Sequence, residues 1–180
     1  VGGGPGVAAM HHIAKGHHNA GNYVIACIGA RNKDLLLFHR ELSLFCDEVL
    51  VSTDDGSFGE KGIVTDLVRS RLDSEGGNIA EVVAVGPVPM MQAVAELTRG
   101  YGGKSTVSLN SLMVDGLGMC GACRVTVGGE MKFTCVDGPE FDGHQVDFAE
   151  LRSRLSSFRD QERLAAREHR CLCFEKGGKA

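Results

Sequence analysis

Short apolar runs alternate with segments of helical periodicity over residues 1–109. The predicted strands are 23–28, 48–52, 81–85 and 105–109. The predicted helices are 7–18, 33–45, 63–72 and 89–99. A continuous apolar run such as 23–28 is typical of a strand that is covered on both faces. Strands that alternate with helices form right-handed βαβ units, so we predict an α/β domain with a parallel sheet at 1–109.

The pattern changes after this domain. Residues 110–145 form a compact segment rich in cysteine and glycine, with a predicted hairpin at 124–134 around Gly128 and Gly129. Residues 146–180 are strongly charged. Here we predict one helix over 148–168, followed by a tail that we expect to be mobile and that contains Cys171 and Cys173. The sequence therefore predicts three regions, 1–109, 110–145 and 146–180.

Composition excludes several classes of protein. The chain has 180 residues, 43% hydrophobic and 23% charged, which is ordinary for a globular protein. Its net charge of −4 gives no basic footprint for a nucleic acid. We find no apolar run long enough to cross a membrane and no signal peptide, so we expect a cytoplasmic protein. The chain begins in a glycine turn without a methionine, and we expect it to be a fragment that lacks its N-terminal part.

Glycine-rich and acidic loops follow the predicted strands. In a parallel sheet the carboxyl ends of the strands meet at one edge, where ligands bind. The run Gly2–Gly6 is typical of a phosphate-binding turn, because glycine lets backbone N–H groups approach a pyrophosphate. A tight strand-to-helix connection without a ligand is the alternative interpretation. The other loops at this edge contain Gly29, Ala30, Arg31, Asp54, Asp55, Gly86 and Pro87.

Seven cysteines, an odd number, favour buried thiols and a metal site over a disulfide framework. Cys120 and Cys123 are two residues apart, and Cys135 returns across the predicted hairpin. Asp115 precedes Cys120 by five positions, so the set matches the spacing of plant-type 2Fe–2S loops with a carboxylate in first place. Gly116, Gly118 and Gly121 suit a loop that needs positive φ angles. Zinc and a redox-active Cys120–Cys123 pair remain the alternatives.

Two stretches carry a specific resemblance. Residues 113–124, Met-Val-Asp-Gly-Leu-Gly-Met-Cys-Gly-Ala-Cys-Arg, and 133–143, Phe-Thr-Cys-Val-Asp-Gly-Pro-Glu-Phe-Asp-Gly, resemble the ferredoxin–NADP reductase-like small subunits. These include the flavin and 2Fe–2S subunit of NADH-dependent ferredoxin:NADP oxidoreductase, also called sulfide dehydrogenase. The electron-transfer subunit of dihydroorotate dehydrogenase is similar but uses four cysteines. Residues 53–59 and 86–91 also match the nucleotide domain of that family, and the resemblance extends to about residue 155.

The resemblance implies cofactors and roles. Asp115, Cys120, Cys123 and Cys135 would hold a 2Fe–2S cluster. NAD(H) or NADP(H) would place its pyrophosphate on Gly3, Gly4 and Gly6. Its adenosine would lie near Gly29, Ala30 and Arg31, and its ribose at Asp54 and Asp55. Its nicotinamide would lie near Gly86 and Pro87. FAD would bind mainly to an N-terminal β-barrel that precedes the nucleotide domain in the family and is missing from this sequence.

The implied function is an electron relay. Electrons would pass between NAD(P)H, a flavin and the 2Fe–2S cluster, towards a larger glutamate-synthase-like flavoprotein, with ferredoxin a further possible partner. The alternatives are the electron-transfer role in dihydroorotate dehydrogenase and a zinc-stabilised binding module without catalysis. We expect His11, His12, His17 and His18 to form a polar helix surface, and Cys27 and Cys46 to be inert thiols.

Overall fold

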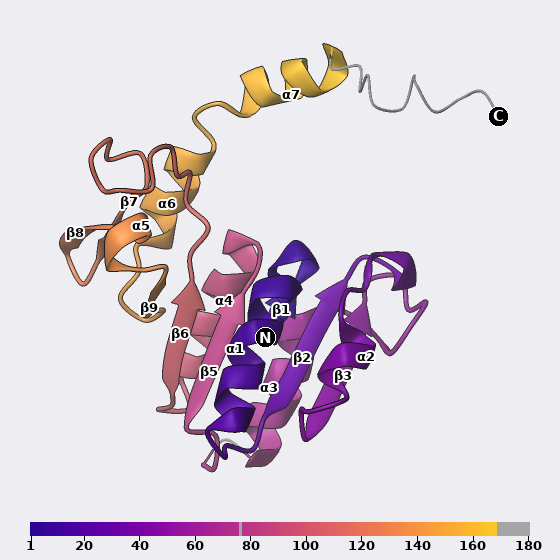
Figure 1. Cartoon of the computed structure of the whole chain (residues 1–180). Coiled ribbons are helices and arrows are strands. Elements are labelled where there is room, and N and C mark those ends of the chain that lie inside the picture. Colours follow the sequence, from indigo (N-terminus) through magenta and orange to yellow (C-terminus); the bar gives the residue numbers. More distant parts are fainter. Residues whose placement is uncertain (76, 169–180) are drawn as a thin grey trace.

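The computed structural model describes residues 1–75 and 77–168. Its main sheet has the strand order β4-β3-β2-β1-β5-β6-β9, and every pair is parallel except β6 with β9. The strands are β1 (Gly2–Gly3), β2 (Ile25–Ala30), β3 (Glu48–Thr53), β4 (Glu60–Lys61), β5 (Glu81–Val85), β6 (Lys104–Ser108) and β9 (Glu140–Asp142). The predicted α/β fold with a parallel sheet is confirmed (Figure 1).

Helices cover both faces of this sheet. The longer helices are α1 (Val7–Asn19), α3 (Val64–Glu75), α4 (Val88–Arg99), α6 (Phe148–Leu155) and α7 (Arg159–Glu168), of which α7 contributes to neither face. Short turns are η1 (Gly4–Gly6), η2 (Lys33–Leu35), α2 (His39–Leu42) and α5 (Thr134–Asp137). Side chains of α1 and α2 form one apolar cluster with Ala26 and Ile28, and those of α3, α4 and α6 form another with Cys27. Neighbours along β2 thus enter opposite clusters, as a strand covered on both faces requires.

The strand order places β1 between two halves of the sheet. From β1 the chain runs outward through β2 and β3, and then crosses back to β5 and β6 on the other side of β1. The order therefore reverses between β1 and β5. A crevice at such a switch point, outside the carboxyl ends of the strands, is where ligands bind in open α/β sheets.

Two predicted helices are broken. The predicted helix 33–45 consists of η2 and α2, because Leu36 turns to extended backbone and Phe38 has φ 57°, in the left-handed region. The predicted helix 148–168 consists of α6 and α7. At the break, the hydroxyls of Ser156 and Ser157 both donate to the carbonyl of Ser153, which competes with continued helical bonding.

The cysteine-rich segment has its own small sheet and also joins the main one. The predicted hairpin is confirmed as β7 (Arg124–Val127) paired with β8 (Glu130–Phe133), and Gly128 and Gly129 turn at φ 62° and 81°. The strand β9, which the sequence did not predict, pairs with β6 at the edge of the main sheet. In Figure 1 this segment lies beyond β6, and α7 extends away from the sheet. None of the helices within residues 1–75 and 77–168 is long and apolar enough to span a membrane.

Candidate functional site

A cleft of about 680 Å³ opens at the carboxyl ends of β1, β2, β3 and β5. It contains most of the residues that the sequence predicts for a nucleotide: Gly3, Gly4, Gly29, Ala30, Arg31, Asp54 and Pro87. Gly6, Asp55 and Gly86 do not line it. The structure therefore brings seven of the ten predicted residues together at one edge of the sheet. The other three lie outside the cleft lining.

Gly6 and Gly86 allow two backbones to touch beneath the cleft. A Cβ added to Gly6 would lie 2.6 Å from the carbonyl oxygen of Val85 and 2.7 Å from the Cα of Gly86. A Cβ on Gly86 would lie 3.0 Å from the carbonyl oxygen of Gly3. Gly4 differs, because it has φ +52° and open space within 4 Å of a Cβ. Gly4 is thus the glycine of this turn that combines a left-handed backbone with a place on the cleft wall.

The two aspartates after β3 have different environments. The Asp55 carboxylate accepts hydrogen bonds from the hydroxyl of Ser57 at 2.6 Å and from its backbone N–H at 2.9 Å. These bonds lower the pKa of Asp55 and tie it to its own loop. Asp54 and Arg31 both line the cleft, so an acidic and a basic residue lie together beside the ends of β2 and β3.

Apolar side chains complete the cleft, and sequence reasoning missed them. Leu35 and Leu37 come from the broken segment after β2, Ile63 precedes α3, and Met90 belongs to α4. Leu35 and Ile63 are 51% and 57% exposed. An apolar wall beside a glycine turn and a few charged groups is the usual composition of a ligand site. The sequence did offer one indication of this wall, because these large apolar residues stand outside the periodic pattern of core positions.

Two of the three cysteines of this segment are in contact, Cys123 from the loop before β7 and Cys135 from α5. The Sγ atoms of Cys123 and Cys135 lie 3.3 Å apart, and Cys123 is buried whereas Cys120 is exposed. The pKa of the Cys135 thiol is raised, mainly by the hydrogen bond between these two sulfurs and to a smaller extent by burial. The backbone N–H of Ala122 points to the Sγ of Cys120 at 3.5 Å. One thiol pair therefore forms across α5 and the start of β7.

Asp115 lies against Cys120. Its Oδ1 accepts from the N–H of Leu117 at 2.9 Å, and its Oδ2 accepts from the N–H of Cys120 at 2.7 Å. The bond from Leu117 is the largest cause of the lowered pKa of Asp115. The predicted positive φ angles of Gly116, Gly118 and Gly121 are confirmed at 71°, 78° and 67°. The segment thus presents two pairs of candidate donors, Asp115 on the backbone of Cys120 and the thiol of Cys123 beside that of Cys135.

The donor set can be compared with the ligands of a two-iron cluster. Asp115, Cys120, Cys123 and Cys135 offer one carboxylate and three thiols. Among the described residues, no group of three or more His, Cys, Asp or Glu side chains is placed so as to hold a metal ion. In a 2Fe–2S cluster each iron takes two protein ligands, so two adjacent pairs match the donor set. The residues present therefore fit the iron–sulfur group that their spacing predicts.

Residues that sequence reasoning did not single out hold the loop in place. The carbonyl of Cys123 accepts hydrogen bonds from the hydroxyl of Thr134 at 3.0 Å and from that of Ser111 at 3.4 Å. Both Thr134 and Ser111 are buried. The carbonyl of Ala122 accepts from the guanidinium of Arg154, on α6, at 3.1 Å. These contacts fix the backbone on either side of Cys123, and they depend on tertiary packing that residue spacing does not reveal.

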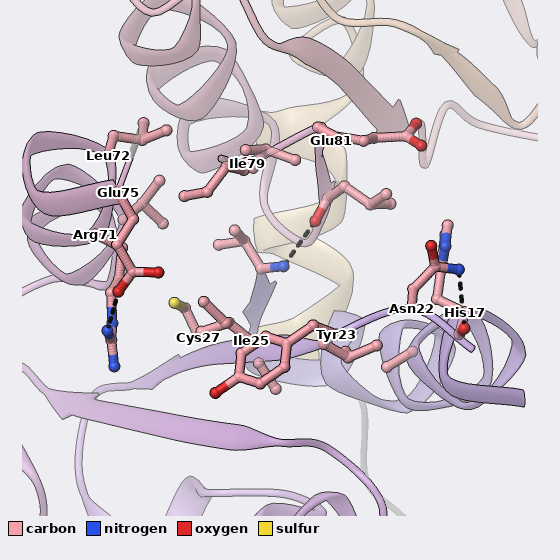
Figure 2. A pocket seen from close by; sticks show the side chains of 18 of the residues that line it. His17, Asn22, Tyr23, Ile25, Cys27, Arg71, Leu72, Glu75, Ile79 and Glu81 are labelled. Atoms are coloured by element: carbon pink, nitrogen blue, oxygen red, sulfur yellow. Dashed lines mark hydrogen bonds and ion pairs between the residues drawn. The ribbon is translucent and has the colours of Figure 1, made fainter. Parts of the chain in front are cut away.

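A second cavity, of about 510 Å³, lies at the opposite edge of the sheet, at the amino ends of β2 and β5. Figure 2 shows its lining, including Ile25, Cys27 and Ile79, with an ion pair between Arg71 and Glu75 at its rim. It contains none of the predicted site residues. The cavity lies between β2, of six residues, and β5, of five, beside β1, of only two. It is a gap between two strands, so we place the ligand chemistry at the carboxyl edge instead.

The remaining candidates have structural surroundings. His11 packs at 5.2 Å from the rings of both Phe38 and Phe45, and His18 lies 6.0 Å from Phe45. Part of the predicted polar helix surface is therefore in contact with aromatic rings of the segment after β2. Burial raises the pKa of Cys27 and of Cys46, which keeps both thiols protonated. Cys171 and Cys173 lie outside the described residues.

Comparisons with known proteins agree with this geometry. The family model for the iron-sulfur cluster binding domain of dihydroorotate dehydrogenase B matches residues 110–147. A Thermotoga maritima protein named as a homologue of the dihydroorotate dehydrogenase B (NAD(+)) electron transfer subunit is 48% identical over 92% of this chain. A Clostridium beijerinckii protein named only from its position in the adh 3′ region is 44% identical over 93% of the chain.

A solved structure is similar as well. A chain of the NADH-dependent reduced ferredoxin-NADP oxidoreductase, solved in work on flavin-based electron bifurcation, is 47% identical and superposes with a TM-score of 0.82 over 92% of this chain. The present chain spans 57% of the length of the Thermotoga protein and 59% of that solved chain. Over the region it shares with them, the chain is therefore similar to electron-transfer subunits of flavin-dependent oxidoreductases, and its residues 110–147 match an iron-sulfur cluster binding domain.

Proposed function

We propose that this chain is the nucleotide- and cluster-binding part of a flavin-dependent oxidoreductase subunit, and that it relays electrons between NAD(P)H, a flavin and a 2Fe–2S cluster. The observation that carries the proposal is that the glycine loop holds the Asp115 carboxylate on the backbone N–H of Cys120, while Cys135, from α5, brings its thiol to that of Cys123. When bound, the flavin and cluster supply the hydride and single-electron chemistry, and the protein orients them.

The two sites are joined through one edge of the sheet. The strand β6 ends beside β5, and the side-chain amide of Asn110 donates to the carbonyl of Gly86 at 3.4 Å. The cysteine-rich segment thus leaves the sheet next to the loop where we propose that the nicotinamide lies, at Gly86 and Pro87. A relay needs its two binding sites at a fixed separation, and this connection supports that requirement.

We propose that the cleft binds NAD(H) or NADP(H), with the pyrophosphate at the Gly3–Gly6 turn and the adenosine near Gly29, Ala30 and Arg31. The apolar wall formed by Leu35 and Ile63 suits a heteroaromatic ring. Asp54 can accept from a ribose 2′-hydroxyl, whereas Arg31 can pair with a 2′-phosphate. Asp55 is a weaker candidate for binding the ribose, since its carboxylate already accepts a hydrogen bond from Ser57.

We assign FAD to another part of a longer protein or to another chain, as in the subunits that this chain resembles. The proposed partner is a larger glutamate-synthase-like flavoprotein, with ferredoxin as a further electron carrier. A second candidate partner is a dihydroorotate dehydrogenase, because the Thermotoga relative and the matching family model carry that name. Asp115 in place of a fourth cysteine favours the ferredoxin:NADP branch. Co-purification with one or the other flavoprotein distinguishes the two.

Anaerobic reconstitution with iron and sulfide tests the proposal. We expect iron and acid-labile sulfide in equal amounts, a red-brown visible spectrum, and an electron paramagnetic resonance signal on reduction. Cys135→Ser should lose most of the cluster. Cys46→Ser, which changes a partly buried thiol outside the loop, should retain it. A colourless protein that retains zinc instead of iron, or a Cys135→Ser variant with the wild-type spectrum, would contradict the proposal.

A further inference from the structure

The helix α6 is attached firmly beside the cysteine loop. Phe148 and Leu151 are 7% and 1% exposed and belong to the larger apolar cluster. On the side facing β7, the carboxylate of Glu150 accepts from the N–H of Thr126 at 3.1 Å, and the N–H of Asp147 donates to the carbonyl of Thr126 at 2.9 Å. The first turns of α6 are therefore fixed to the strand that follows Cys123.

From the last turn of this helix, Arg154 reaches the turn between two cluster ligands. Its guanidinium donates to the carbonyl of Ala122 at 3.1 Å, across 32 positions of sequence, and the contact is partly buried. The backbone N–H of Ala122 points to the Sγ of Cys120 at 3.5 Å. Ala122 is thus held on both sides, with its N–H towards a ligand sulfur and its carbonyl oxygen on a positive charge.

We propose that Arg154 is a positioning residue for the cluster and raises its reduction potential; this inference rests on the proposed 2Fe–2S function. The bond to the guanidinium holds the Ala122–Cys123 peptide in place and so restrains Ala122, whose own N–H points to Cys120. N–H groups on ligand sulfurs favour the reduced, more negative cluster. The cationic charge acts in the same direction, because reduction adds a negative charge nearby. Both effects raise the potential.

Arg124 makes a comparable contact in a different setting. Its guanidinium donates to the carbonyl of Gly121 at 3.1 Å, but the contact is local in sequence and exposed. Solvent screens an exposed charge more strongly than a partly buried one. We therefore assign the larger influence on the potential to Arg154, whose position is set by the packing of α6.

The test compares Arg154→Met with Arg152→Met in the full chain, after anaerobic reconstitution and with iron and sulfide content matched. Arg152 lies on the same helix, is exposed, and its side chain makes no hydrogen bond or ion pair within residues 1–75 and 77–168. Both variants lose one positive charge. The readout is the midpoint potential of the cluster, from a redox titration followed by visible absorption and electron paramagnetic resonance.

We expect Arg154→Met to lower the ratio of reduced to oxidised cluster about threefold or more at the wild-type midpoint, where a tenfold change corresponds to about 59 mV for one electron. Arg152→Met should change it by less than half as much. Equal midpoints for the wild type and Arg154→Met, or equal shifts in both variants, would overturn the inference. If Arg154→Met retains no cluster, Arg154→Gln replaces it, because glutamine removes the charge but keeps an amide donor, and an unshifted midpoint there overturns the inference too. A wild-type chain without iron would instead refute the proposed function.

Discussion

Replacing Gly6 with alanine tests the packing beneath the nucleotide cleft. Gly6 has φ −61° and ψ −19°, so an alanine fits its backbone conformation without strain. The new methyl group would meet three backbone atoms, the carbonyl oxygen of Val85 at 2.6 Å and the Cα and nitrogen of Gly86 at 2.7 and 2.8 Å. Backbone atoms of a central strand cannot swing aside as a flexible side chain does. The substitution must therefore push the turn after β1 away from β5.

Overpacking of this kind costs about 1–3 kcal/mol in the free energy of unfolding. For a chain of this size, 1 kcal/mol shifts Tm by roughly 2–4 °C, so we expect a decrease of about 2–12 °C. Gly16→Ala is the matched control. It adds the same methyl group within α1, where no atom beyond the helix's own backbone lies within 4 Å of the new atom. Because alanine favours helix over glycine by about 0.5–1 kcal/mol, this control should raise Tm by about 1–4 °C.

Thermal and urea unfolding of both variants, at equal iron content, give the comparison. The displaced turn should also weaken binding of the nucleotide to Gly6→Ala more than to Gly16→Ala. If Gly6→Ala unfolded at or above the wild-type temperature, the close approach of the two backbones would not exist as described, and the reason given for this glycine would be refuted.

Three further predictions concern single carboxylates and their partners. Asp115→Cys should retain a cluster but change its midpoint potential in a redox titration, because thiolate is a softer ligand than carboxylate; an unchanged midpoint argues against ligation by Asp115. Asp54→Asn should weaken NADH binding about tenfold and Arg31→Met should weaken NADPH binding instead, which titration calorimetry measures; identical effects on both nucleotides would contradict these assignments. Burial acts to raise the pKa of Glu81, but hydrogen bonds, the first of them from Thr106, lower it by more, so the net pKa in the folded state is lowered. The stability that the ionised Glu81 carboxylate contributes is therefore present above its unfolded-state pKa, and it is lost as pH falls through the folded-state pKa. Glu81→Gln should therefore weaken the acid dependence of urea unfolding, and an unaltered dependence would count against this pair.

The sequence predicted the features that depend on local pattern. Short apolar runs located β2, β3 and β5, because a strand buried on both faces carries that pattern wherever it pairs. The predicted spacing of Asp115, Cys120 and Cys123 matched a loop that the structure forms, since ligands on one loop are local in sequence. The glycines at 116, 118 and 121 have the expected backbone angles.

What the sequence did not predict depends on distant contacts. The edge strand β9 has only three residues and no distinctive pattern, and it forms because β6 offers it a partner. The segment after β2 has helical periodicity, but Asn32 caps only a short turn and Phe38 then turns left-handed, which places Leu35 and Leu37 on the cleft. Arg154 carries no motif, and its role follows only from where α6 packs.

The separation of the two proposed sites is a property of the sheet rather than of a linker. The cysteine loop begins where β6 ends, at Asn110, and β9 returns the chain to the same strand through Phe141 opposite Val107. Both ends of the cysteine-rich segment are therefore anchored to β6, next to the β5 loop that borders the cleft. A loop tied at one end could swing about that point, whereas two anchors on one strand hold the donor pairs at a set distance from Gly86. Electron transfer between bound cofactors depends on such a fixed distance, so we assign β9 to the architecture of the proposed relay although it contributes no proposed ligand.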